Sequence, residues 1–305
     1  MIARAAVVAA TRLNGPLPAR VPSCSAMETW TVRRVLGWTA ERFGRERYES
    51  PRLDAEILLA YVLSAKRIEL YMDHDRALAG GELERFRELV KRRLDGEPVA
   101  YLVGRREFWS LDLKIDPRVL VPRPESEALV EEALARLAGR VRPRLLDVGT
   151  GSGALALALA NERPDAEVWA TDLSPGAVEL AGENAERLGL AVRVVLGDLL
   201  AGAAGERFDL VIANLPYLRP DEVRPSLRHE PRMALTAEDD GFALTRRLID
   251  EAPDALAPGG VLAVEVASGR ADEILAMFGA RGAYDQPRVR NDLSGIERVV
   301  SAALA

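Results

Sequence analysis

Residues 147 to 153 read Asp-Val-Gly-Thr-Gly-Ser-Gly, and this stretch decides the fold class. An apolar segment, Arg144 to Val148, leads into the turn, and a helical pattern from Ala154 to Asn161 follows it. Glycines after a strand allow a tight turn and let the backbone approach a ligand without a clash from a Cβ atom. A strand, a glycine-rich turn and a helix in this order are typical of nucleotide-binding α/β folds. We therefore expect a nucleoside-bearing cofactor at this turn.

Strand and helix patterns alternate through the rest of the chain. This alternation predicts a mostly parallel sheet with helices on both faces, and ligand sites at the carboxyl ends of its strands. The further strands that we expect are Val168–Thr171, Val192–Val195, Asp209–Ala213 and Val261–Val266, with Tyr284–Val289 and Arg298–Ala303 to complete the sheet. The further helices that we expect are Ser126–Leu137, Pro175–Leu188 and Phe242–Leu256.

The first hundred residues have a different pattern. Residues 28–97 predict a small all-helical domain, which we expect to recognise a partner, with Thr31 as the N-cap of its first helix. Residues 98–122 predict a β-hairpin linker, because apolar positions near Phe108 recur with a period close to two. Residues 123–305 then form the α/β domain. Residues 1–27 are expected to be disordered or a non-native extension, with no acidic residue before Glu28.

Composition limits the remaining possibilities. The 305 residues contain no apolar run long enough for a transmembrane helix, so we expect no membrane association. The net charge of -6 argues against a surface that binds nucleic acid generally. A lone cysteine, Cys24, fits a reducing compartment, and we expect a cytoplasmic protein. His74 and His229, the two histidines, are too few with one cysteine for an ordinary zinc site, so we expect no metal.

Two acidic residues after strands fit a nucleoside. Asp172 ends the second strand of the α/β domain, where an acid accepts hydrogen bonds from both ribose hydroxyls. Asp198 follows the third strand and is placed to accept from an adenine amino group. The turn has Gly-x-Gly-x-Gly spacing rather than the Gly-x-Gly-x-x-Gly of dinucleotide-binding proteins, which disfavours a nicotinamide cofactor. The cofactor residues predicted in the turn itself are Gly149, Thr150, Gly151, Ser152 and Gly153.

The tetrapeptide Asn214-Leu215-Pro216-Tyr217 closes the fourth strand and is the predicted reacting site. An amide nitrogen is a poor nucleophile, and a site helps by accepting both of its hydrogens and aiming its lone pair. The side-chain oxygen of Asn214 and the backbone carbonyl of Leu215 are the acceptors that we expect, and Tyr217 would pack on the planar group. Beside the glycine turn, this predicts a methyltransferase that uses S-adenosylmethionine and acts on an amide or amino nitrogen.

With these motifs the chain closely resembles the HemK/PrmC family, the methyltransferases of the glutamine in peptide chain release factors. The resemblance spans about residues 27–305. It rests on the glycine turn, on the Asn214 tetrapeptide and on three further stretches: residues 101–109, Val121 to Glu127, and Glu230-Pro231 followed by Asp240-Gly241.

The resemblance implies a seven-stranded, Rossmann-like class I methyltransferase sheet that uses S-adenosyl-L-methionine. It also implies a release factor as protein substrate, methylated in its Gly-Gly-Gln loop, with an effect on translation termination. By the same resemblance, Leu199 and Asn214 join residues 149–153 and Asp172 around the cofactor, and residues 214–217 hold the glutamine. We expect a monomer.

Leu215 is a departure from the family pattern, which is Asn-Pro-Pro-Tyr. Leucine still offers the backbone carbonyl that the mechanism needs. The rigid proline ring is lost. Such a ring commonly stabilises the folded protein by about 0.4 to 1 kcal/mol, because it restricts the conformations of the unfolded chain. We therefore expect an active but slower site, and a paralogue with another amide substrate is the weaker interpretation.

Three other functions stay open at this stage. A ribosomal-protein glutamine methyltransferase would use the same catalytic residues. A nucleic-acid methyltransferase acting on an exocyclic base amine would want a basic cluster with aromatic residues, and the nearest candidate is Arg105, Arg106, Phe108 and Trp109. A core Phe and Trp in an ordinary hairpin explains that cluster better, so direct nucleic-acid binding is not expected. The third is a non-catalytic protein that keeps the cofactor fold.

Overall fold

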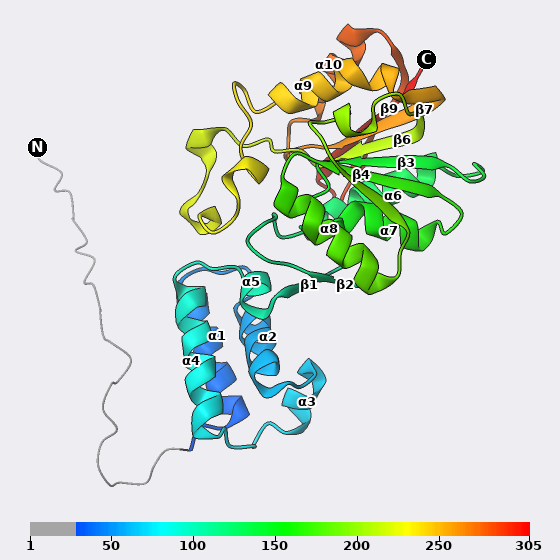
Figure 1. Cartoon of the computed structure of the whole chain (residues 1–305). Helices are drawn as coiled ribbons and strands as arrows, with labels where there is room; N and C mark the ends of the chain where they lie inside the picture. The colour runs from blue at the N-terminus through cyan, green and yellow to red at the C-terminus, as the bar shows by residue number, and fades with distance from the viewer. Residues whose placement is uncertain (1–28) are drawn as a thin grey trace, which may run out of the picture.

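A computed structural model describes residues 29–305, and the expectation for residues 1–27 lies outside them. The chain forms two parts joined by a small hairpin (Figure 1). A cluster of helices comes first, and a sheet with helices on both faces follows.

The first part is all helical, as expected. Thr31 caps the first helix, because its side chain accepts a hydrogen bond from the backbone N–H of Arg34. The helices bury one apolar cluster of their own, in which Phe43, Leu58 and Phe86 are almost fully enclosed. They are α1 (Val32–Arg45), α2 (Pro51–Leu63), α3 (Arg67–Met72), α4 (Gly80–Leu94) and α5 (Val99–Val103).

The segment between the two parts is only partly a hairpin. Strands β1 (Arg105–Phe108) and β2 (Leu111–Lys114) pair antiparallel, as the alternating pattern predicts. Helix α5 occupies residues 99–103, where the sequence predicted the start of the hairpin. That helix ends at Gly104, which has a φ of 73° and so takes a left-handed conformation that suits glycine.

The second part contains a seven-stranded sheet of order β5-β4-β3-β6-β7-β9-β8. The first five strands in this order are parallel, and β9 and β8 add an antiparallel edge. This is the fold class predicted from the sequence. The strands are β3 (Arg144–Val148), β4 (Glu167–Asp172), β5 (Val192–Leu196), β6 (Phe208–Ala213), β7 (Leu256–Glu265), β8 (Tyr284–Asn291) and β9 (Glu297–Leu304).

Each face of the sheet has its own apolar core. Side chains of successive residues alternate between the faces, so Leu145 joins one cluster and Leu146 the other. The helices that cover the sheet are α6 (Glu127–Arg136), α7 (Ala154–Glu162), α8 (Pro175–Leu188), α9 (Ala243–Glu251) and α10 (Ala271–Arg281). Figure 1 shows α7 and α8 on the face opposite to α9 and α10.

The sequence also misplaced the end of one helix and the start of the strand that follows it. The helix predicted over 242–256 ends at Glu251, and residues 252–254 form a short 3-10 turn around Pro253. Proline lacks the N–H that a continuing helix would need. Strand β7 therefore begins at Leu256, and Gly260 passes so close to the carbonyl of Phe208 that a Cβ would lie 2.8 Å from it.

Candidate active site

The predicted motifs meet where the strand order reverses. From β3 the chain builds outward through β4 to β5, then returns to add β6 on the other side of β3. The glycine turn follows β3, and Asn214 follows β6, so both lie at the carboxyl ends of neighbouring parallel strands. Crevices at such switch points are the ligand sites of open α/β sheets.

A cavity opens at this point, and it brings together most of the predicted site residues. The lining includes Gly149, Thr150, Gly151, Ser152, Asp172, Asp198, Leu199, Asn214, Leu215 and Pro216. The predicted residues Gly153 and Tyr217 are not among the residues that line it. Gly153 serves packing instead, since a Cβ there would lie 3.0 Å from Leu157 and 3.3 Å from Ala181.

Asp147 stabilises the glycine turn by hydrogen bonds to the residues that follow it. Its carboxylate accepts hydrogen bonds from the hydroxyl of Thr150 (2.6 Å) and from the backbone N–H of Ala156 (3.2 Å). The side chain is 1% exposed, and this burial raises the pKa of Asp147 to about 7. The carboxyl group thus fixes both the turn and the start of α7.

Asp172 ties the same turn to the next loop. One oxygen accepts from the backbone N–H of Gly151 (2.9 Å), and the other accepts from that of Ser174 (2.8 Å). Burial raises the pKa of Asp172, against the effect of these hydrogen bonds. Each carboxylate oxygen has a second lone pair, so the group remains able to accept from a ligand in the cavity.

Asp198 and Leu199 follow strand β5 and line the cavity. Asp198 is exposed and forms an ion pair with Arg247 at 3.0 Å. Leu199 is buried with a φ of 47°, and its carbonyl accepts a hydrogen bond from the hydroxyl of Thr171. A leucine in the left-handed region is rare, and its backbone position is therefore specified by the surrounding structure.

Asn214 presents its side chain in a defined way. Its Nδ2 donates to the hydroxyl of Ser126 at 2.9 Å, and among residues 29–305 its Oδ1 has no hydrogen-bond partner. Tyr217, three residues on, is half-buried, and burial followed by the charge of Glu265 raises its pKa. A Cβ at Gly241 would lie 2.4 Å from the Tyr217 carbonyl, so only a glycine fits beside this turn.

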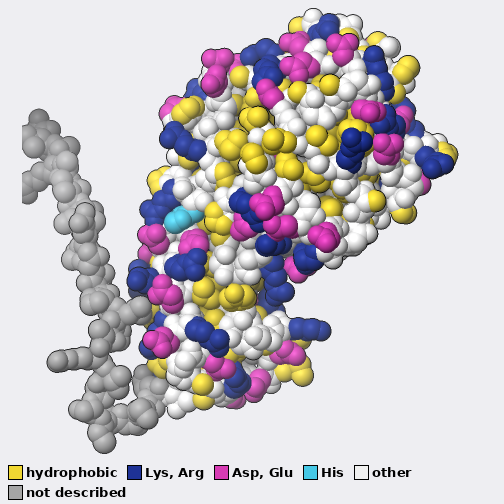
Figure 2. Space-filling view, viewed as in Figure 1, with side chains coloured by type: hydrophobic (Ala, Val, Ile, Leu, Met, Phe, Trp, Pro, Cys, Tyr) yellow, Lys and Arg dark blue, Asp and Glu magenta, His cyan; other side chains and the backbone are white. Residues whose placement is uncertain are grey.

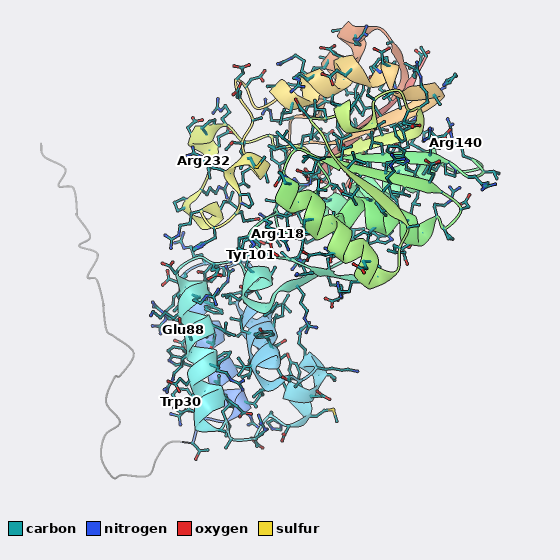
Figure 3. The ribbon with its side chains drawn as sticks, in the orientation of Figure 1. Trp30, Glu88, Tyr101, Arg118, Arg140 and Arg232 are labelled. Carbon is teal, nitrogen blue, oxygen red and sulfur yellow. The ribbon has the colours of Figure 1, made fainter. Side chains whose placement is uncertain are left out.

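A buried acid anchors the segment that covers the cavity. Glu230 accepts from the backbone N–H of Val121 (3.0 Å) and from the guanidinium of Arg123 (2.5 Å). The Pro-Arg-Pro-Glu stretch is thereby fixed to the loop after β6, 107 residues later in the chain. Arg118 also lines the cavity, and the hydroxyl of Tyr101 donates to the carbonyl of the next residue, Val119, at 2.5 Å. Figure 3 labels Tyr101 and Arg118 at the junction of the two parts.

The same loop touches the helical part. Arg228 forms an ion pair with Asp95 at 2.6 Å, and the ring Nε2 of His229 lies 3.0 Å from the Asp95 carbonyl. His229 therefore contacts the end of α4 and does not line the cavity. The geometry gives it a place at the junction, in keeping with the interpretation of it as a loop residue.

The basic and aromatic cluster of the hairpin is not an open stacking surface. Phe108 is 2% exposed, and Trp109 is half-buried with its indole N–H bonded to Glu162 at 2.8 Å. The interpretation of the two as packing residues is therefore confirmed. Phe108 nevertheless borders the cavity.

Sequence reasoning missed two polar side chains at the site. Ser126 occurs in the Pro-Arg-Pro-Glu-Ser stretch, which carried the resemblance but gave this hydroxyl no role. Glu265 ends the apolar run Val-Leu-Ala-Val-Glu, and an acid in a buried strand was a signal that could have found it. Both are buried; Ser126 is hydrogen-bonded to Asn214, and Glu265 interacts with Ser126.

Residues 29–305 contain neither a metal-binding cluster nor a membrane-spanning helix. The structure brings no three His, Cys, Asp or Glu side chains of these residues together in a group that could hold a metal ion. Of their helices, none is both long and apolar enough to cross a membrane.

Comparison with known proteins assigns the family. Residues 34–104 match the PrmC N-terminal domain, and residues 125–233 match the methyltransferase small domain. The release factor glutamine methyltransferase of Rhodopirellula baltica is 42% identical over 283 residues, which cover 89% of this chain and 96% of that protein. The chain belongs to the release factor glutamine methyltransferase family.

Other members and one solved fold agree. The release factor glutamine methyltransferase of Escherichia coli is 42% identical over 82% of this chain and 91% of its own length. The catalytic domain of hMettl16 has a TM-score of 0.53 at 16% identity, with 68% of this chain and 80% of that domain covered. This likeness shows the shared methyltransferase fold, while the family assignment rests on the release factor glutamine methyltransferases.

Proposed function

We propose that this enzyme methylates the side-chain amide nitrogen of the glutamine in the Gly-Gly-Gln motif of peptide chain release factors, with S-adenosyl-L-methionine as methyl donor. The family relatives support the substrate. One observation carries the chemistry: the Oδ1 of Asn214 has no partner among residues 29–305 and belongs to a side chain that lines the cavity beside the glycine turn.

The residues of the cavity fit that cofactor. Asp172 would bind the two ribose hydroxyls, and Asp198 with the backbone of Leu199 would contact the adenine. Glycines 149 and 151, both with positive φ, keep the turn free of side chains where the cofactor would lie. When bound, the cofactor supplies an electrophilic methyl group on a sulfonium.

The tetrapeptide then holds the acceptor. Asn214 Oδ1 and the carbonyl of Leu215 would each accept one N–H of the substrate amide, which orients its nitrogen toward the methyl group. Pro216 limits the geometry of the preceding residue to extended backbone and so helps to aim that carbonyl. Acceptors of this kind become stronger hydrogen-bond partners in a water-poor cavity. The proton leaves after the nitrogen has become cationic, so no strong base is needed.

Leu215 is compatible with this role. Its side chain is 6% exposed and packs on Gly149, so the residue that replaces the family's proline is held by its neighbours rather than by a ring. We expect the carbonyl to be available and turnover to be slower than in a proline-containing relative.

The helical part is proposed to recognise the release factor. Ion pairs such as Arg228–Asp95 tie it to the loop that carries the site. On the face in Figure 2, basic and acidic side chains are interspersed, a distribution that supports a protein partner more than a nucleic acid. We propose a monomer that acts in the cytoplasm, where release factors are made.

Methyl transfer from labelled cofactor to purified acceptors tests this proposal. The panel contains an unmethylated release factor, its Gln→Ala variant, ribosomal proteins and RNA. We expect label on the wild-type release factor alone. Label on a ribosomal protein or on RNA, with none on the release factor, would contradict the proposed substrate.

A further inference from the structure

Ser126 stands between Asn214 and Glu265. It accepts a hydrogen bond from Asn214 Nδ2 at 2.9 Å. On its other side lies the carboxyl group of Glu265, whose pKa the Ser126 hydroxyl lowers, as a hydrogen-bond donor does. Ser126 is 4% exposed and Glu265 is 8% exposed. The Oε2 atom of Glu265 has no hydrogen-bond partner among residues 29–305. A buried acid with a free oxygen beside the reacting site requires a reason.

The three side chains come from separate elements. Strands β6 and β7 are parallel neighbours in which Ala213 pairs with Val264, so Asn214, just after β6, and Glu265, the last residue of β7, lie at the same level. Ser126 ends the short 3-10 turn Pro124–Ser126 that leads into α6. The fold thus brings a hydroxyl between an amide and an acid that are far apart in the chain.

The three side chains, Asn214, Ser126 and Glu265, have one consistent arrangement of hydrogen-bond donors and acceptors. An ionised carboxylate can only accept hydrogen bonds, so Glu265 takes the hydroxyl hydrogen of Ser126. The oxygen of Ser126 is then left to accept, and its donor is the NH₂ group of Asn214. Because the NH₂ group faces Ser126, the Oδ1 atom faces away from it. A carboxylate two side chains away therefore decides which end of the Asn214 amide is free.

We propose that Ser126 and Glu265 are positioning residues that hold Asn214 with its Oδ1 free to accept from the substrate amide. This inference rests on the proposed function, in which that oxygen takes an N–H of the glutamine. With the amide reversed, the NH₂ group of Asn214 would oppose the NH₂ group of the substrate, and binding in the reactive orientation would be lost.

The surroundings of Glu265 make the arrangement sensitive to pH. Burial raises the pKa of Glu265 to about 7, against the hydrogen bond from Ser126 and the charge of Arg298. Glu125 and Arg123 also act on this carboxyl group, and Tyr217 faces it. Once protonated, Glu265 can donate to Ser126, and the hydroxyl hydrogen is then free to turn toward Asn214 and reverse its amide.

Steady-state kinetics on a release factor test the proposal. We expect Ser126→Ala to lower kcat about tenfold, the loss of roughly one hydrogen bond, with both KM values near wild type. Ser126→Thr should restore kcat because it restores the hydroxyl. Below about pH 7 the kcat of the wild type should fall, and this dependence should vanish in Ser126→Ala and Glu265→Gln.

The chain provides a matched control. Ser301 is fully buried, and its hydroxyl donates to Glu132 at 2.7 Å, away from the cavity. Ser301→Ala should lose stability as Ser126→Ala does, yet keep kcat and its pH profile. Equal kcat and equal pH profiles in wild type, Ser126→Ala and Ser126→Thr would overturn the proposal.

A second measurement does not depend on the substrate. In ¹⁵N NMR spectra of the enzyme alone, the Asn214 NH₂ resonances, assigned with Asn214→Asp, should shift as Glu265 titrates. The shift should be absent from Ser126→Ala and from Glu265→Gln. Unchanged wild-type resonances across that range would overturn the positioning role. An enzyme that shows the shift but methylates no release factor would instead refute the proposed function.

Discussion

The side chain of Leu215 packs against Gly149, so that a Cβ on the glycine would lie 3.1 Å from the leucine Cδ2. The contact joins the turn after β3 to the turn after β6, and both turns line the cavity. It also explains how a leucine is accommodated in the Asn214 tetrapeptide. The space left by the absent Cβ of Gly149 receives its side chain.

Gly149→Ala is expected to weaken cofactor binding by about tenfold. Gly149 has a φ of 73°, a conformation that costs other residues roughly 1–2 kcal/mol, and the added methyl group would also press on Leu215. Calorimetric titration with S-adenosylmethionine measures the effect. Gly139→Ala is the control, because Gly139 has a φ of 79° but does not border the cavity. A wild-type Kd for Gly149→Ala would contradict this account of the turn.

Asn214→Ala should reduce kcat by about a hundredfold or more, near 2.7 kcal/mol on the rate scale. The variant removes the acceptor for one substrate N–H but leaves the cofactor residues Asp172 and Leu199 in place. The Kd for the cofactor should therefore change far less than kcat does. Single-turnover methylation with saturating cofactor measures the chemical step. Near-native turnover would refute the role of the Asn214 oxygen.

Glu230→Ala should lower both stability and turnover. The change leaves the buried N–H of Val121 unsatisfied and frees Arg123, at an expected cost of about 1–3 kcal/mol. Urea unfolding gives the stability, and the methylation assay gives the turnover. Glu230→Gln keeps an acceptor for Val121 and should lose less. His229→Ala, at the preceding residue, loses only the contact of its ring with the Asp95 carbonyl and should cost less stability. A loss equal to that of Glu230→Ala would argue against the buried acid as anchor.

Stability is expected to fall as pH rises from about 4.5 to 7. Asp147 and Glu265 have ordinary pKa values of 3.8 and 4.5, and burial raises the pKa of each to about 7 in the folded protein. The folded state therefore holds more protons than the unfolded state in this window, and the stabilisation by those protons is lost as the pH reaches 7.

Urea unfolding at several pH values measures this decrease. Each group contributes on the order of a few kcal/mol at most. Glu265→Gln cannot titrate at this position, so its stability should depend less on pH than that of the wild type. An equally steep decrease in Glu265→Gln would show that the buried acid is not a source of it.

The sheet and the location of the site could be predicted from the sequence. Alternating strand and helix patterns predicted the parallel core, and the turns after Val148 and Ala213 placed the motifs at strand ends. Helix α3, with six residues, carries too little periodic signal to be found. The hairpin linker predicted over 98–122 wrongly included residues 99–103, because an apolar run of five residues does not separate strand from helix.

The parts of the site that escaped prediction depend on contacts between distant residues. The hydrogen bond from Asn214 to Ser126 joins positions 88 residues apart. Glu230 and Arg123 are 107 residues apart. No local pattern specifies such pairs, because strand order and loop packing bring them together. Their residue types, a serine before a helix and an acid in a loop, also have ordinary roles in capping and solvation.

Tandem mass spectrometry of a release factor after reaction with this enzyme tests the central claim most directly. We expect one added methyl group, on the side-chain amide of the Gly-Gly-Gln glutamine, in the wild-type reaction. The same peptide should be almost unmodified after reaction with Asn214→Ala. A methyl group on another residue, or equal modification by both enzymes, would contradict the account.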